Sequence, residues 1–97
     1  MEVVACGRVV EVRRARRTRS GVHEYFFVQA APGDRIEVFS NASVMGEFPV
    51  RVGQRARVKG RYFHDRDGRE GIDWTHHDGP GSRWPAGYVT LNGVTYR

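Results

Sequence analysis

The segment Arg55-Ala-Arg-Val-Lys-Gly-Arg-Tyr62, which leads through Asp65-Arg-Asp-Gly68 to Ile72-Asp-Trp74, decides the fold. It alternates strictly between charged residues and small or apolar ones, the pattern of a β-strand with one buried face. The Asp-Gly pair then predicts a hairpin that returns the chain along the same sheet. The register of this hairpin determines which residues enter the core.

Two turn lengths compete for this hairpin. A two-residue turn would pair Arg61 with Trp74 and mix charge with core residues. A three-residue loop with Gly68 in the left-handed conformation instead pairs Tyr62 with Ile72, and Gly60 then makes room for Trp74 opposite it. We therefore predict the second register, with an inward row of Ala56, Val58, Gly60, Tyr62, Ile72, Trp74 and His76. The outward row is Arg55, Arg57, Lys59 and Arg61, with Asp73 opposite Arg61, Thr75 opposite Lys59 and His77 opposite Arg57.

Three strands are predicted upstream, over residues 3–12, 22–30 and 35–40. In the second of them one face carries Val22, Glu24, Phe26 and Val28, and the other carries His23, Tyr25, Phe27 and Gln29. Pro32-Gly-Asp34 predicts the turn to the third strand, and Asn92-Gly93 predicts a final hairpin that pairs Leu91 with Val94 and Val89 with Tyr96. Residues 41–50 are broken by Gly46 and Pro49, so at most one helical turn fits there.

Five short strands with a weak helical turn between the third and the fourth are typical of an OB-type barrel. We predict an all-β fold: a small OB-type five-stranded barrel with a C-terminal β-hairpin extension and little helix. At 97 residues the chain is expected to form a single domain over residues 1–97.

Basic residues indicate an anionic partner. The chain has 16 Lys plus Arg against 11 Asp plus Glu, a net charge of +5, and Lys59 is its one lysine. Arginine binds phosphate bidentately and stacks on bases, which favours nucleic acid, although a GC-rich genome also enriches arginine. The run Arg13-Arg-Ala-Arg-Arg-Thr-Arg19 is predicted to be an exposed basic loop after the first strand.

The usual ligand face of an OB-type barrel lies on its second and third strands, between the loop after strand one and the loop between strands four and five. Here those loops are residues 13–21 and 65–70, and the face offers His23, Tyr25, Phe27, Arg35, Glu37 and Phe39. Rings beside guanidinium groups suit a single strand of DNA or RNA. Some of these aromatics must instead fill the barrel, Phe26 or Phe27 among them. The predicted binding residues are Arg13, Arg14, Arg16, Arg17, Arg19, Tyr25, Phe27, Phe39, Arg57, Lys59 and Arg61.

The segment Trp74-Thr-His-His-Asp78 raises a second hypothesis, a metal-assisted hydrolase or nuclease centred on His76, His77 and Asp78. Adjacent side chains on a strand point to opposite faces, so the two histidines would not share an ion unless the backbone turns. A metal set of His76, Asp78 and distant His64 lacks the paired spacing of known zinc motifs. We favour a structural role, in which His76 faces inward and Asp73 pairs with Arg61, and we predict no catalytic residue and no cofactor.

The same segment resembles a family of small bacterial domains of unknown function. Their C-terminal half reads Trp-Thr-His-His-Asp-Pro, then a glycine, an aromatic residue and a closing Gly-x-x-Tyr. The match is Trp74-Thr-His-His-Asp78, Gly81, Trp84 or Gly87-Tyr88, and Asn92-Gly-Val-Thr-Tyr96, with a looser likeness at Val52-Gly53 and Gly60-Arg-Tyr62. Gly79 departs from the family's proline. The resemblance implies an OB-like barrel and a bacterial origin, but no activity.

We expect a soluble, cytoplasmic protein. The N-terminal residues read as a strand rather than as the export signal that many members of that family carry, and no apolar run is long enough to span a bilayer. A lone Cys6, expected to be buried or half-buried, fits a reducing compartment. A protein partner that pairs with an exposed strand is a third hypothesis.

Overall fold

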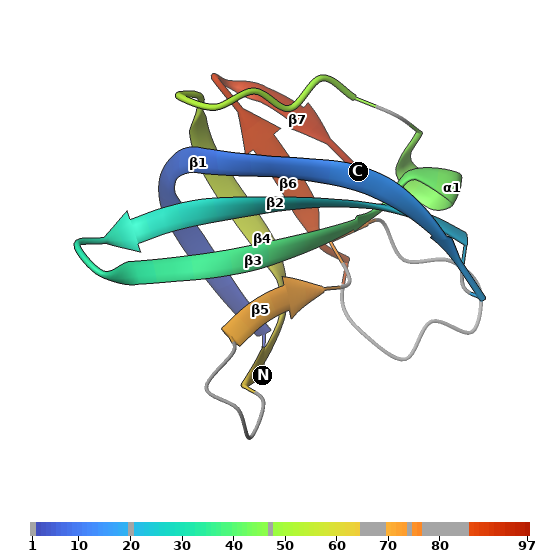
Figure 1. Ribbon diagram of the computed structural model, residues 1–97, viewed down its shortest axis with the longest axis horizontal. Coiled ribbons are helices and arrows are strands. Elements are labelled where there is room, and N and C mark those ends of the chain that lie inside the picture. Colours follow the sequence, from blue (N-terminus) through green and yellow to red (C-terminus); the bar gives the residue numbers. More distant parts are fainter. Residues whose placement is uncertain (1, 20, 47, 65–69, 74, 77–85) are drawn as a thin grey trace.

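The computed structural model describes residues 2–19, 21–46, 48–64, 70–73, 75–76 and 86–97. These residues form seven strands and one four-residue helix, which lies between the third and the fourth strand (Figure 1). In chain order the elements are β1 (Glu2–Thr18), β2 (Gly21–Ala31), β3 (Asp34–Asn41), α1 (Ala42–Met45), β4 (Arg55–His64), β5 (Glu70–Asp73), β6 (Tyr88–Leu91) and β7 (Val94–Tyr96). Within the described ranges, no helix has the length and apolar character needed to cross a membrane.

Five strands close into a ring in the order β1-β2-β3-β5-β4 and back to β1. β3 and β5 run parallel, and the other neighbours run antiparallel. The ring closes because β1 is long and bent: Glu2 to Arg8 pair with β4, whereas Arg8 to Thr18 pair with β2 (Figure 1). This arrangement is compatible with the predicted OB-type barrel, and β6 and β7 extend the sheet from β4 as the predicted hairpin.

The core lies inside the ring and consists of the inward residues of each strand. Phe26 is fully buried and Phe27 is only half-buried, so the interior is filled by Phe26. The predicted faces of β2 are therefore confirmed, with Phe26 and Val28 inside. The other fully or almost fully buried apolar residues are Val9, Val38, Val58, Ile72, Val89 and Leu91.

The predicted register of the β4–β5 hairpin is confirmed. Tyr62 pairs with Ile72 and Arg61 pairs with Asp73. Gly60 is buried, and a Cβ there would lie 2.7 Å from Cγ2 of Ile72, so the absence of a side chain does make room at this point. Trp74 and His77 lie outside the described residues.

Thr75 was predicted to face outward opposite Lys59, and this was wrong. Lys59 pairs with Val4 of β1 and Tyr88 of β6. β5 ends at Asp73, and Thr75 is completely buried, with its hydroxyl donating to the carbonyl of Phe39 at 2.9 Å. The polar group is buried without penalty because β3 supplies an acceptor for it.

The basic run was predicted to be a loop, and this was also wrong. Residues 13–18 continue β1 and pair with β2: Arg13 pairs with Tyr25, Arg16 with His23 and Thr18 with Gly21. Pairing with β2 gives the backbone of this run ladder hydrogen bonds on one side, while its arginine side chains stay in solvent. Cys6, expected to be buried or half-buried, is exposed on the first half of β1.

The remaining local predictions agree with the structure. Asn92 and Gly93 both have positive φ, 49° and 85°, as a two-residue hairpin turn requires, and Leu91 pairs with Val94. Tyr96 stacks on Phe48 with ring centroids 4.6 Å apart, which covers one end of the core. The single helical turn α1 begins after Asn41, whose side chain accepts a hydrogen bond from the backbone N–H of Ser43 at 3.1 Å.

Candidate nucleic-acid interface

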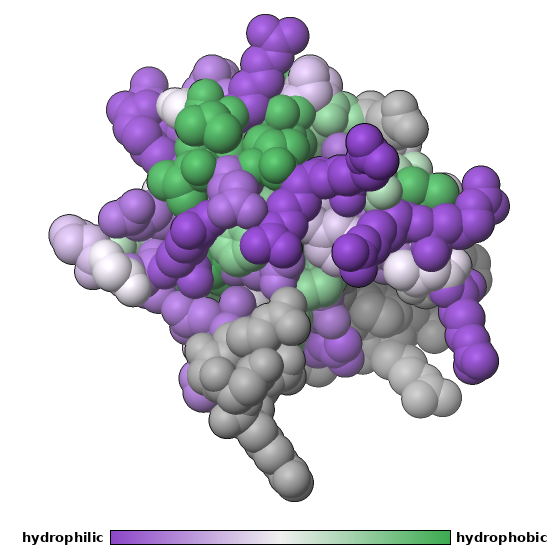
Figure 2. All heavy atoms as spheres, in the orientation of Figure 1, coloured by the Kyte–Doolittle hydropathy of each residue, from purple (hydrophilic) through white to green (hydrophobic). Residues whose placement is uncertain are grey.

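The outward face of β2 and β3, together with the second half of β1, carries most of the predicted binding residues. Tyr25 on β2 pairs with Arg13 on one side and with Phe39 on the other, so the three side chains stand in a row across the sheet. In the same orientation as Figure 1, Figure 2 shows hydrophilic side chains extending across the region where these strands run.

An aromatic row crosses this face. The ring centroids of His23 and Tyr25 are 6.4 Å apart, those of Tyr25 and Phe39 5.1 Å, and those of Phe39 and Phe63 5.4 Å. All four rings are half-buried, so each presents part of its surface to solvent. The row joins β2, β3 and β4, although β5 lies between β3 and β4. Phe63 of β4 can reach Phe39 of β3 because its ring packs across Gly71 of β5.

A β-bulge places three arginines beside this row. The register shifts between Arg13 and Arg16, so that three residues of β1 advance against two of β2. A bulge breaks the alternation of side chains, and here Arg14 lines the same hollow as its neighbours Arg13 and Arg16. The arginine hollow, as we name it, is open, has a volume of about 520 Å³ and is lined by Arg13, Arg14, Arg16, Tyr25, Glu37 and Phe39.

The charge of the arginine hollow is strongly positive at its rim. Arg14 and Arg16 are exposed and form no ion pair among the described residues. The single carboxylate that lines the hollow, Glu37, is 7% exposed, whereas the arginines reach into solvent. An anion that approaches from solvent therefore meets guanidinium groups first.

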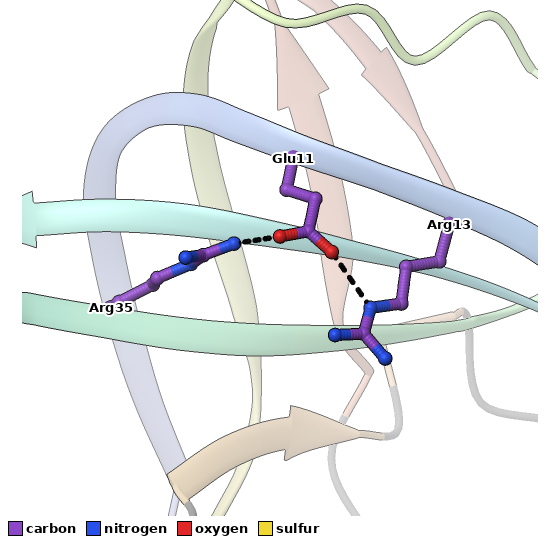
Figure 3. Close-up of polar contacts among 3 residues, drawn as sticks. All are labelled: Glu11, Arg13 and Arg35. Carbon is purple, nitrogen blue, oxygen red and sulfur yellow. Dashed lines mark hydrogen bonds and ion pairs between the residues drawn. The ribbon is translucent and has the colours of Figure 1, made fainter.

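Phe27 lies beneath a second group of charges. The guanidinium groups of Arg13 and Arg35 lie 5.0 Å and 4.6 Å from its ring centroid. Glu11, which pairs directly with Phe27 across the β1–β2 ladder, accepts hydrogen bonds from Arg13 Nε at 2.8 Å and from Arg35 (Figure 3). The hydrogen bond from Arg13, with further contributions from Arg35, lowers the pKa of Glu11 below its ordinary 4.5. We call Glu11, Arg13 and Arg35 the Glu11 clamp.

Carboxyl groups lie at the edge of this face that borders β5. The Glu70 carboxylate accepts a hydrogen bond from the Tyr62 hydroxyl at 2.6 Å. A hydrogen bond with Asp34 lowers the pKa of Glu70, and the same contact raises the pKa of Asp34. The hydrogen bond to Glu70 also raises the pKa of Tyr62. A second open hollow, of about 560 Å³, extends from the Glu11 clamp past Phe27, Gly33 and Glu37 to Glu70.

Other predicted residues lie elsewhere. Arg17 pairs with Val22, one step along the strand from Arg16, and neither it nor the exposed Arg19 lines the arginine hollow. Arg57, Lys59 and Arg61 stand on the outer face of β4 and pair with the first half of β1. On the other side of β4, Arg57 and Lys59 pair with β6, and Arg61 pairs with β5. Of these, Arg61 donates two hydrogen bonds to Asp73, at 2.8 and 2.7 Å, and Lys59 lies 3.5 Å from Glu2. The structure therefore brings together Arg13, Arg14, Arg16, Tyr25 and Phe39, with Phe27 adjacent.

The alternative site falls mostly outside the described residues, which exclude His77 and Asp78. His76 is half-buried, and its carbonyl accepts a hydrogen bond from the backbone N–H of Gly87 at 2.8 Å. His64 is exposed at the end of β4. Within the part of the chain that the structure describes, no three His, Cys, Asp or Glu residues are grouped as metal ligands.

Sequence reasoning missed three features of this face. Phe63 lies two residues after Arg61 and so shares its outward face, opposite Gly71, a signal that the predicted register already contained. Arg35 was noted on the face but not assigned to the site. The role of Glu11 had no signal in the sequence, because it depends on a pairing with Phe27 that a second register shift, between Val9 and Glu11, creates.

No protein-family model matches the chain, including any for the family that the Trp74–Asp78 segment resembles, and no curated protein has a matching sequence.

Proposed function

We propose that this protein is a non-enzymatic module that binds single-stranded DNA or RNA on the outward face of β1, β2 and β3. The observation that carries the proposal is the arginine hollow, in which three arginines from one strand stand beside the rings of Tyr25 and Phe39. Cations that track phosphates and rings that stack on bases are the two elements of single-strand recognition without sequence preference.

The aromatic row supports a single strand rather than a duplex. Stacking needs an unpaired base with an accessible face, and the rings of Tyr25, Phe39 and Phe63 are half-buried rather than enclosed in the core. A duplex would keep its bases stacked within the helix and offer the protein only phosphates and groove edges. We therefore expect the rings to add affinity for a single strand that a duplex does not receive.

The charge distribution supports an anionic ligand. The net charge of +5 is unevenly placed, and Arg14 and Arg16 stand without ion pairs among the described residues. On β4, Arg61 and Lys59 are neutralised by ion pairs, whereas the exposed Arg55 and Arg57 form none within the described part of the chain. We place the main contact at the arginine hollow and treat the β4 residues as a secondary basic surface.

The test is fluorescence-anisotropy titration of labelled single-stranded DNA, single-stranded RNA and duplex DNA over a range of salt concentrations. We expect single strands to bind more tightly than duplex, with an affinity that falls steeply as salt rises, by a logarithmic slope of about 0.7 per phosphate contacted. The probe is recovered afterwards to establish that it is intact.

Two results would overturn the proposal. The first is affinity no greater than that of an unrelated protein of equal net charge, which would reduce the interaction to bulk electrostatics. The second is a probe that is cut only when a divalent metal ion is added. Cleavage would favour the alternative site at His76, His77 and Asp78, and His76→Ala would then be expected to abolish it.

A further inference from the structure

Phe27 holds two guanidinium groups close together. Arg13 comes from β1 and Arg35 from β3, and both lie within 5.0 Å of the ring centroid. Each gains from the cation–π interaction, but two like charges over one ring repel each other. The arrangement therefore calls for an anion between them.

Glu11 supplies that anion in the free protein. Its two carboxylate oxygens are divided between the arginines, one accepting from Arg13 Nε and the other from Arg35 (Figure 3). The carboxylate thus bridges two cations with two oxygens, as the two non-bridging oxygens of a phosphodiester also do. All three side chains are exposed to solvent, by 37% for Glu11, 58% for Arg13 and 48% for Arg35, so a ligand has access to the bridge.

We propose that Arg13 and Arg35 form a phosphate site for the bound strand, and that Glu11 occupies this site in the free protein and is displaced by the phosphate. The inference rests on the proposed function, because the phosphate belongs to the same single strand. Both guanidinium groups contact the Phe27 ring directly, and the phosphate that replaces Glu11 supplies the anion that offsets their mutual repulsion. Glu11 is then a competitor that limits affinity.

The position of the Glu11 clamp determines where the contact with the bound nucleic-acid strand ends. Arg13 lines both the arginine hollow and the second hollow, so a strand that follows Arg16 and Arg14 reaches the clamp next. Glu70 lines the second hollow but not the arginine hollow, and its carboxylate repels a further phosphate. The phosphate at Arg13 and Arg35 is therefore the last one held on this side.

The test compares Glu11→Gln with Glu2→Gln, using a labelled oligothymidylate and the anisotropy assay. Glu2→Gln is a matched control because it removes the same charge from a residue that is also 37% exposed and also pairs with a cation. Glu2 differs in its position, on the first half of β1 opposite Arg61. We expect Glu11→Gln to raise affinity about threefold to tenfold over wild type, because the phosphate no longer has to break two exposed ion pairs in order to bind. We expect Glu2→Gln to change affinity by less than about twofold. Adding Arg35→Ala to Glu11→Gln should remove the gain.

The outcomes separate the inference from the function on which it rests. Equal affinity of Glu11→Gln and Glu2→Gln, or weaker binding by Glu11→Gln, overturns the displacement while leaving single-strand binding intact. Absence of binding by wild type and both variants overturns the proposed function itself. A second readout uses the Arg13 Nε–Hε signal in NMR spectra of wild type: saturation with oligothymidylate should shift it, and binding that leaves it unmoved would contradict the exchange of acceptors.

Discussion

Phe63 lies across Gly71: a Cβ on Gly71 would stand 2.5 Å from Cζ of the Phe63 ring. The two residues are direct partners in the β4–β5 ladder, and the missing side chain lets the ring cross β5 toward Phe39. A glycine in a strand interior weakens the strand, and here it is compensated by an aromatic contact that links β4 to β3. The continuity of the aromatic row depends on this pair.

We therefore predict that Gly71→Ala costs about 1–3 kcal/mol of unfolding free energy, because the added methyl group must displace the Phe63 ring. Urea unfolding followed by fluorescence measures the change. The double variant Gly71→Ala with Phe63→Leu should be less destabilised than the sum of the two single variants, since the smaller side chain leaves room for the methyl group. Strict additivity would contradict the packing argument.

Much of the fold could be predicted from the alternation of residues and from turn chemistry. The β4–β5 register followed from the consistency of faces around Tyr62 and Ile72, and Asn92-Gly93 identified the last hairpin. Both are local signals, in which neighbouring residues determine the conformation. The core inside the ring of strands was also predictable up to the choice between Phe26 and Phe27.

The basic run could not be placed in the same way. Its polarity is typical of a loop, and its strand conformation depends on partners in β2 that lie several residues away. The bulge between Arg13 and Arg16 has no sequence pattern of its own, yet it decides which arginines share a face. The composition therefore predicted that a basic site exists, but only the structure showed which arginines belong to it.

The bulge yields a prediction that distinguishes neighbouring arginines. Arg16→Ala should weaken oligothymidylate binding roughly threefold to tenfold and reduce the logarithmic salt slope by about 0.7, because one phosphate contact is lost from the arginine hollow. Arg17→Ala is the matched control, as Arg17 pairs with Val22 and does not line the hollow. The anisotropy salt series measures both, and equal losses in the two variants would mean that net charge rather than position controls binding.

Thr75 allows the structural part of the Trp74–Asp78 segment to be tested. Thr75→Val keeps the shape of the side chain but removes the hydroxyl that donates to the Phe39 carbonyl, at a position with no exposure to solvent. We expect a loss of about 1–3 kcal/mol in the free energy of unfolding, the cost of a buried acceptor without its donor. Denaturant unfolding provides the measurement, and an unchanged midpoint would show that this hydroxyl does not hold the segment to β3.

Glu11 gives the clamp a signature in acid. Hydrogen bonds from Arg13 and Arg35 hold its pKa below 4.5, so its ion pairs stabilise the folded state at pH values above that unfolded value. As the pH falls through the lowered pKa of the folded state, the carboxylate is protonated and this stabilisation is lost. A ¹³C NMR titration of the Glu11 carboxyl should give a midpoint below 4.5, and the stability of Glu11→Gln should fall less on acidification than that of wild type. A Glu11 midpoint at or above 4.5 would contradict the bridge between Arg13 and Arg35 in solution.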